Sequence, residues 1–134
     1  MRGTLQAYKK VSVDSQLDAA SPHRIIQMLL AGAIERLIQG KAAMLAGNTA
    51  QKGERLGKAI DILTNLKASL TRETPEAEAI ANNLEELYDY MIRQVFDANV
   101  NNETAGLDTV IELLREIKIS WDQIPAELHH IGAE

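Results

Sequence analysis

One stretch of the chain, residues 84–99, carries more apolar residues than a single helix face can hold. Tyr90, Ile92 and Phe96 lie on its flanks, where a lone amphipathic helix is polar. The other apolar residues repeat every three or four positions, which places them on one side of an α-helix. They are Leu84, Leu87, Tyr88, Met91, Val95 and Ala98, continuing back through Ala77, Ile80 and Ala81. The pattern predicts a helix that packs into a core and keeps further apolar surface for a neighbour or a partner.

The composition favours a helical protein with one core. Hydrophobic residues make up 46% of the 134 residues but aromatic residues only 4%, which suits helix packing better than sheets of aromatic and β-branched strands. A chain of this length without a low-complexity linker predicts a single domain. Cysteine is absent, so disulfides and thiolate metal sites are excluded and a reducing cytoplasm is compatible with the chain. The sequence shows no signal peptide or membrane-spanning run, so we expect a soluble protein without membrane insertion.

The charge of the chain is unevenly distributed. The net charge is −5, yet residues 1–46 and 49–70 carry an excess of positive charge and residues 71–134 a larger excess of negative charge. We therefore expect the first two helices to pack beside the last two. No concentrated basic stripe is present, which argues against nucleic acid as a partner.

Start and stop signals predict a first helix over residues 22–46. Ser21 is a suitable N-cap and Pro22 suits the first helical position, while Gly47 and Asn48 tolerate the left-handed backbone that ends a helix. The predicted inner residues are Ile26, Leu30, Ala33, Leu37 and Met44. Apolar residues beyond those that one partner helix needs are Ile25, Met28, Ile38 and Leu45.

A second helix is predicted to begin with Thr49 as its cap. Gly53 and Gly57 weaken its first turns by about 1 kcal/mol each relative to alanine. They indicate either late ordering and fraying there or a close approach to a neighbouring backbone. The predicted inner residues are Leu56, Ala59, Ile60, Leu63, Leu66 and Leu70.

Thr74 and Pro75 repeat the cap-and-proline signal and open the third, central helix. A fourth helix follows residues 99–102 and ends before Pro125. Its predicted inner residues are Leu107, Val110, Leu114, Ile117, Trp121 and Ile124, and Leu113 and Ile119 lie off that stripe. Four amphipathic helices with short turns predict an all-α protein, an antiparallel up-and-down four-helix bundle over residues 21–124.

The two ends of the chain are predicted to lie outside this bundle. Residues 125–134 form a short tail that we expect to be mobile. Residues 1–20 form an N-terminal arm in which Leu5 and Tyr8 share one helical face. The arm is either a frayed terminus or a segment that lies over exposed apolar surface.

No set of residues in the sequence supports catalysis or metal binding. A di-iron bundle needs two Glu-x-x-His motifs, whereas only Glu127 and His130 show this spacing, in the predicted tail. His23 lies at a helix start, not mid-helix as histidine phosphotransfer requires, and there is no Gly-rich phosphate loop. Asp89 is expected to face solvent and Tyr88 to lie in the core, so the Tyr88–Asp89–Tyr90 run is not an acid–base site. We expect no enzyme activity and no cofactor.

The surplus of apolar flank residues leaves three interpretations open. Broad apolar faces can simply fill a compact core in which each helix touches two others. A groove can instead receive an amphipathic segment of another protein. A helical signalling or scaffold module that pairs with its own copy through the same surface would need the same residues.

Several short runs also resemble a known family. They are Ala20-Ser21-Pro22 with Ile26, Met28-Leu29, Gly32-Ala33, Lys58-Ala59-Ile60, Asn83-Leu84, Leu87-Tyr88-Asp89-Tyr90-Met91 and Ala98-Asn99. In this combination, from about Tyr8 to Trp121, the chain resembles the FliS family of flagellar secretion chaperones. Leu30-Ala31 departs from the aromatic and acidic pair usual in that family, and Thr74–Glu78 replaces a glycine-containing turn. Both departures are compatible with a bundle.

The resemblance implies a cytoplasmic export chaperone that holds the C-terminal segment of flagellin, blocks premature filament assembly and helps to deliver flagellin to the flagellar export apparatus. It also implies that the arm bearing Tyr8 can lie against the bundle and move when flagellin binds. Weak self-association of the chain is compatible with this resemblance. Together with the flank residues, it indicates a partner-binding surface made of Leu5, Tyr8, Ile25, Met28, Leu29, Ile38, Tyr90, Phe96, Asn99 and Leu113.

Overall fold

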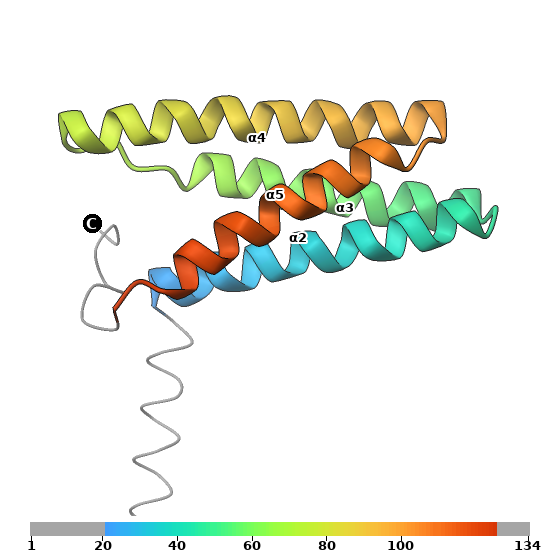
Figure 1. The fold of residues 1–134 in the computed structure, drawn as a ribbon, viewed down its shortest axis with the longest axis horizontal. Coiled ribbons are helices and arrows are strands. Elements are labelled where there is room, and N and C mark those ends of the chain that lie inside the picture. The colour runs from blue at the N-terminus through green and yellow to red at the C-terminus, as the bar shows by residue number, and fades with distance from the viewer. Residues whose placement is uncertain (1–20, 126–134) are drawn as a thin grey trace, which may run out of the picture.

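In a computed structural model, residues 21–125 are described and form four α-helices. They are α2 (Pro22–Leu45), α3 (Thr49–Ala68), α4 (Pro75–Asn101) and α5 (Ala105–Asp122), and no strand occurs between residues 21 and 125. Each helix packs on the next, and α5 returns to α2, so the four helices close a ring. Figure 1 shows α2, α3 and α4 running alternately in opposite directions, with α5 crossing obliquely from the end of α4 to the start of α2. The predicted all-α, antiparallel four-helix bundle is confirmed.

The helix ends follow local backbone chemistry. The Ser21 side chain accepts a hydrogen bond from the Arg24 N–H, and the Thr74 hydroxyl oxygen accepts one from the Ala77 N–H, so both predicted caps are confirmed. The predicted cap at Thr49 is wrong by one residue. Asn48 is the cap because its side-chain oxygen accepts from the Gln51 N–H at 3.1 Å. Gly47, at φ 73°, supplies the left-handed turn before it.

The core contains the residues that the helical periodicity selects. Leu30, Leu37, Met91 and Val95 are fully buried, and Tyr88 is 4% exposed. Other fully buried core residues are Ala33, Leu56, Ala59, Leu63, Leu107, Val110 and Leu114. Ile111, which was not assigned to the inner stripe of its helix, is also buried. Burial of these apolar side chains makes the largest favourable contribution to the stability of the bundle.

The assignment of Ile80 to the core stripe is wrong, because its side chain is 60% exposed. Ile80 lies near the start of α4, and α5 has turned away toward α2 at this end of the bundle (Figure 1). Ile92, a flank residue expected to be covered by a neighbour or a partner, is half-buried and packs against the core.

Ion pairs join the positively charged first half of the chain to the negatively charged second half, as the charge distribution predicts. Lys41 Nζ lies 2.7 Å from Asp108 Oδ1, and Lys67 Nζ lies 2.7 Å from Asp89 Oδ1. The Asp89 side chain, which was expected to face solvent, is 40% exposed and paired with Lys67. Such surface pairs contribute about 0–1 kcal/mol each and guide orientation more than they add stability.

The glycines of α3 do not bring backbones together. A Cβ added at Gly53 or Gly57 would meet no heavy atom within 4 Å, so the close-approach interpretation is wrong for both. The close approach occurs at Gly40 of α2 instead, where an added Cβ would lie 2.4 Å from Leu56 Cδ2. Gly40 therefore lets α2 and α3 approach each other.

Candidate functional site

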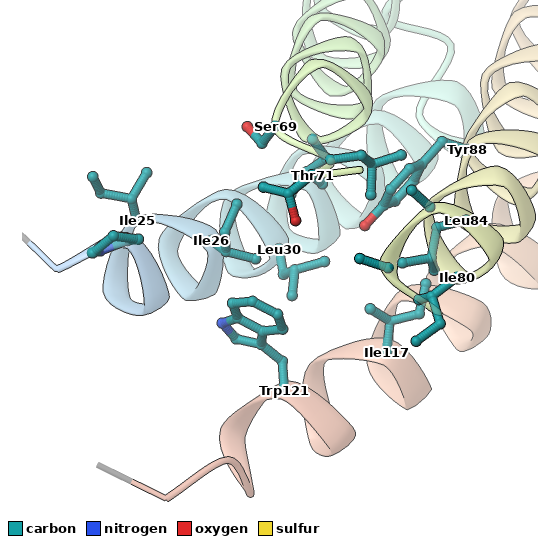
Figure 2. Close-up of a pocket in the computed structure, with 15 residues that line it drawn as sticks. Ile25, Ile26, Leu30, Ser69, Thr71, Ile80, Leu84, Tyr88, Ile117 and Trp121 are labelled. Atoms are coloured by element: carbon teal, nitrogen blue, oxygen red, sulfur yellow. The ribbon is translucent and has the colours of Figure 1, made fainter. Parts of the chain in front are cut away.

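An apolar cleft opens at the end of the bundle where α2 begins and α5 ends. Its volume is about 610 Å³. Figure 2 shows side chains from all four helices and from the α3–α4 connection converging on it. The lining residues are Pro22, Ile25, Ile26, Leu30, Leu66, Ser69, Leu70, Thr71, Ala77, Ile80, Ala81, Leu84, Tyr88, Ile117 and Trp121.

The oblique course of α5 creates this cleft. At the other end of the bundle, Gly106 of α5 packs closely on Gln94 of α4. Toward its C-terminus α5 leans on α2 instead, and the first turns of α4 lose it as a neighbour (Figure 1). Apolar residues that would otherwise be covered by α5, including Ile80 and Leu84, therefore line an open cleft.

Trp121 forms one wall and is held in place by two contacts with the start of α2. Its indole N–H donates a hydrogen bond to the His23 carbonyl oxygen at 2.9 Å. Its ring also stacks on the His23 imidazole, with centroids 5.0 Å apart. The indole is therefore fixed in orientation and presents its face to the cleft (Figure 2).

Tyr88 forms the opposite wall, and its hydroxyl is directed toward the cleft (Figure 2). Burial raises the pKa of the Tyr88 hydroxyl above its ordinary value, so this group is neutral and able to donate at neutral pH. Ser69 and Thr71 add two more hydroxyls near the rim. None of the lining residues is charged, so the cleft is suited to apolar side chains accompanied by a few neutral hydrogen-bonding groups.

The described part of the chain contains no group of three or more His, Cys, Asp or Glu side chains that could hold a metal ion. Glu127 and His130 lie outside the described residues. Within residues 21–125, no helix is both long enough and apolar enough to cross a membrane.

The predicted partner-binding residues fall on several separate parts of the bundle. Of the eight that lie within residues 21–125, only Ile25 lines the cleft. Met28 and Ile38 are exposed on the outer face of α2, and Tyr90 and Phe96 are exposed on α4. Leu5 and Tyr8 lie outside the described residues.

The remaining three predicted residues contact the bundle itself. Leu29 and Leu113 are half-buried and pack against the core. Asn99 is also half-buried, and its carbonyl oxygen accepts a hydrogen bond from Lys52 Nζ at 3.0 Å. The structure thus gives Leu29 and Leu113 packing contacts within the bundle, and Asn99 a hydrogen bond through its backbone carbonyl.

Sequence reasoning missed most of the cleft. Ile80, Leu84, Ile117 and Trp121 line it, but helical periodicity assigned all four to core stripes. A stripe of apolar residues shows which side of a helix faces its neighbours. It does not show whether a neighbouring helix extends along the whole length of that side. The only available signal was the length of the apolar stripe on α4, which begins at Ala77 in its first turn.

Comparison with known proteins identifies the family. The model of the family described as "Flagellar protein FliS" matches residues 4–128. The chain belongs to the FliS family. Members of this family are chaperones and not enzymes.

Several relatives carry the name flagellar secretion chaperone FliS. The chain is 62% identical over 133 residues to that of Vibrio cholerae serotype O1, covering 99% of this chain and 96% of the relative. It is 44% identical to that of Salmonella typhimurium, covering 90% and 88%, and 34% identical to that of Escherichia coli K12, covering 91% and 88%. The FliS match therefore extends over the four helices that build the cleft.

Proposed function

We propose that this chain is a cytoplasmic export chaperone that binds the C-terminal segment of flagellin. In this role it prevents premature filament assembly and assists delivery of flagellin to the flagellar type III export apparatus. The observation that carries the proposal is the uncharged cleft, open to solvent at one end of a bundle whose relatives are named flagellar secretion chaperones. The cleft supplies the apolar surface that a holding chaperone needs.

The cleft is suited to an amphipathic segment. Such a segment buries apolar residues that recur every three or four positions against the walls of a groove. Ile25 and Ile80 extend the apolar surface beyond the cleft, since both line it and are also exposed to solvent. Tyr90 and Phe96 are further exposed apolar side chains along α4 over which a longer client can continue.

The mechanism is holding by equilibrium binding. A client segment that is disordered when free loses conformational entropy on binding, so a wide surface yields only a modest affinity. This balance suits a chaperone that must release its client at the export apparatus. Binding and release of the client need no cofactor or nucleotide.

Substitution of Ile80 tests the proposal at the cleft. We expect Ile80→Asp to weaken binding of a flagellin C-terminal peptide at least tenfold in calorimetric titrations, because it places a charge on an uncharged wall. The fold should survive, since Ile80 is 60% exposed.

Val100→Asp is the matched control, because Val100 is 66% exposed at the other end of the same helix. We expect it to bind the peptide with nearly the affinity of the native chain. Equal affinity of both variants would show that the client does not use the cleft. Absence of binding by the native chain would contradict the proposed function itself.

A further inference from the structure

One hydroxyl group in the cleft, that of Tyr88, is buried but not used by the fold. Tyr88 is 4% exposed, and residues 21–125 give its hydroxyl no hydrogen-bond partner. Figure 2 shows the hydroxyl directed into the cleft. Buried polar groups in proteins are hydrogen-bonded in the large majority of cases. The Tyr88 hydroxyl therefore keeps its bonding capacity for water or for a molecule that enters the cleft.

The other polar side chains that line the cleft differ from Tyr88. Ser69 donates its hydroxyl to the Asn65 carbonyl oxygen at 2.8 Å, and its oxygen points away from the cleft (Figure 2). The indole N–H of Trp121 is already bonded to α2. Thr71 is exposed, so water can satisfy its hydroxyl. Among the lining residues, Tyr88 alone has a polar group that is both buried and uncommitted.

An occupant of the cleft displaces the water that reaches this hydroxyl. An occupant that offers only apolar groups there leaves the hydroxyl desolvated and without a partner, which weakens binding. An occupant with a hydrogen-bonding group at the same point avoids this penalty. A site built in this way rejects a ligand that lacks the polar group more strongly than an apolar wall rejects a ligand of the wrong size.

The chemistry of the cleft limits the partner group to a neutral side chain. No lining residue is charged, and burial raises the pKa of the Tyr88 hydroxyl, so nothing there compensates a buried carboxylate or ammonium. The backbone carbonyls of a helical client bond within its own helix, except in the last turn. The hydroxyl and amide side chains remain, and they fit because a tyrosine hydroxyl both donates and accepts.

We propose that the Tyr88 hydroxyl selects the client through a hydrogen bond to one Ser, Thr, Asn or Gln side chain on the otherwise apolar face of the client helix. The inference rests on the proposed function, in which the client is the C-terminal segment of flagellin. Apolar residues three or four positions before and after the polar one lie on the same face of the client. They pack on apolar walls of the cleft such as Ile26, Leu84 and Ile117.

A double-mutant cycle between chain and client tests this proposal. Peptides of the flagellin C-terminal segment, each with one Ser, Thr, Asn or Gln replaced by alanine, are titrated calorimetrically into the native chain and into Tyr88→Phe. We expect Tyr88→Phe to bind the unmodified peptide about tenfold more weakly than the native chain does. One alanine peptide should lose about tenfold in affinity for the native chain but less than about twofold for Tyr88→Phe.

Thr109→Val is the control, because it removes a hydroxyl from an exposed site on α5 outside the cleft. We expect it to bind every peptide with the affinity of the native chain. Tyr88→Phe keeps the ring in the core and removes a hydroxyl that has no partner in the described fold. Its melting temperature at neutral pH should therefore equal or exceed that of the native chain, whereas a structural role of the hydroxyl would lower it.

The outcomes separate this inference from the proposed function. Equal affinities of the native chain and Tyr88→Phe for all peptides would overturn the inference and leave the proposed function standing. A loss in Tyr88→Phe that couples to no side chain of the peptide would also overturn it, since the hydroxyl would then meet the backbone of the client. Failure of the native chain to bind any peptide would contradict the proposed function and this inference with it.

Discussion

Trp121 and His23 stack with an interplanar angle of 9°, joining the end of α5 to the start of α2. The two residues are almost one hundred positions apart in the chain, and the indole N–H also donates to the His23 carbonyl oxygen. This contact closes the ring of helices at the end where the cleft opens. The same tryptophan therefore supports the fold and forms a wall of the candidate site.

Replacement of Trp121 should separate its hydrogen bond from its packing. Trp121→Phe keeps an aromatic ring but removes the indole donor, so we expect a loss of about 0.5–1.5 kcal/mol in the free energy of unfolding. Trp121→Ala also removes the packed ring and should cost more, about 2–4 kcal/mol, since the residue is only half-buried. Urea denaturation followed by circular dichroism measures both. Equal stability of the two variants would contradict a packing role for the ring.

Alanine substitutions at two glycines should have opposite effects. Gly40→Ala places a Cβ 2.4 Å from Leu56 Cδ2, and the resulting overpacking should destabilise the fold by about 1–3 kcal/mol. Gly57→Ala meets no atom within 4 Å and should stabilise α3 by up to about 1 kcal/mol through helix propensity. Thermal and urea melts compare the two variants. A Gly40→Ala variant more stable than the native chain would show that α2 and α3 can move apart freely.

Lys52 should stabilise the junction between α4 and α5. Its side chain is buried, and Nζ donates to the Asn99 carbonyl oxygen and to Asn102 Oδ1 at 3.0 and 3.1 Å. Lys52→Met removes these bonds while keeping much of the side-chain length, and should cost about 1–3 kcal/mol. Lys58→Met, which breaks only an exposed pair with Glu54, should change stability by less than about 0.5 kcal/mol. Similar losses of stability in Lys52→Met and Lys58→Met would contradict a stabilising role of Lys52 at this junction.

Stability should fall at alkaline pH because of Tyr88. Burial raises the pKa of its hydroxyl in the folded state, so above the ordinary tyrosine pKa of about 10 the unfolded chain releases this proton more readily. The contribution of neutral Tyr88 is complete below that pH and is lost as pH rises through the folded-state pKa. Tyr88→Phe should reduce the alkaline loss, measured by urea denaturation between pH 8 and 11. If the free energy of unfolding of Tyr88→Phe falls with pH as steeply as that of the native chain, other groups cause the alkaline loss of stability.

The bundle could be predicted from sequence because its signals are local. The caps at Ser21 and Thr74 and the periodic residues from Leu84 to Ala98 depend on neighbours within a few turns. The cleft depends on the direction of α5 relative to α4, which no short pattern encodes. Ile80 shows the difference: it has core periodicity, yet it borders open space because α5 leans toward α2. Leu29 and Leu113, which were expected to bind a partner, are half-buried and pack against the core.

The most direct test of flagellin binding in the cleft uses Trp121, the single tryptophan of the chain and a wall of the cleft. A tryptophan-free peptide of the flagellin C-terminal segment is titrated into the native chain while indole emission and heat are recorded. We expect saturation at one peptide per chain, a blue shift of the emission as the indole loses contact with water, and a negative heat-capacity change from apolar burial. Heat of binding without any change in the emission would contradict binding in the cleft, and no binding at all would contradict the proposed function.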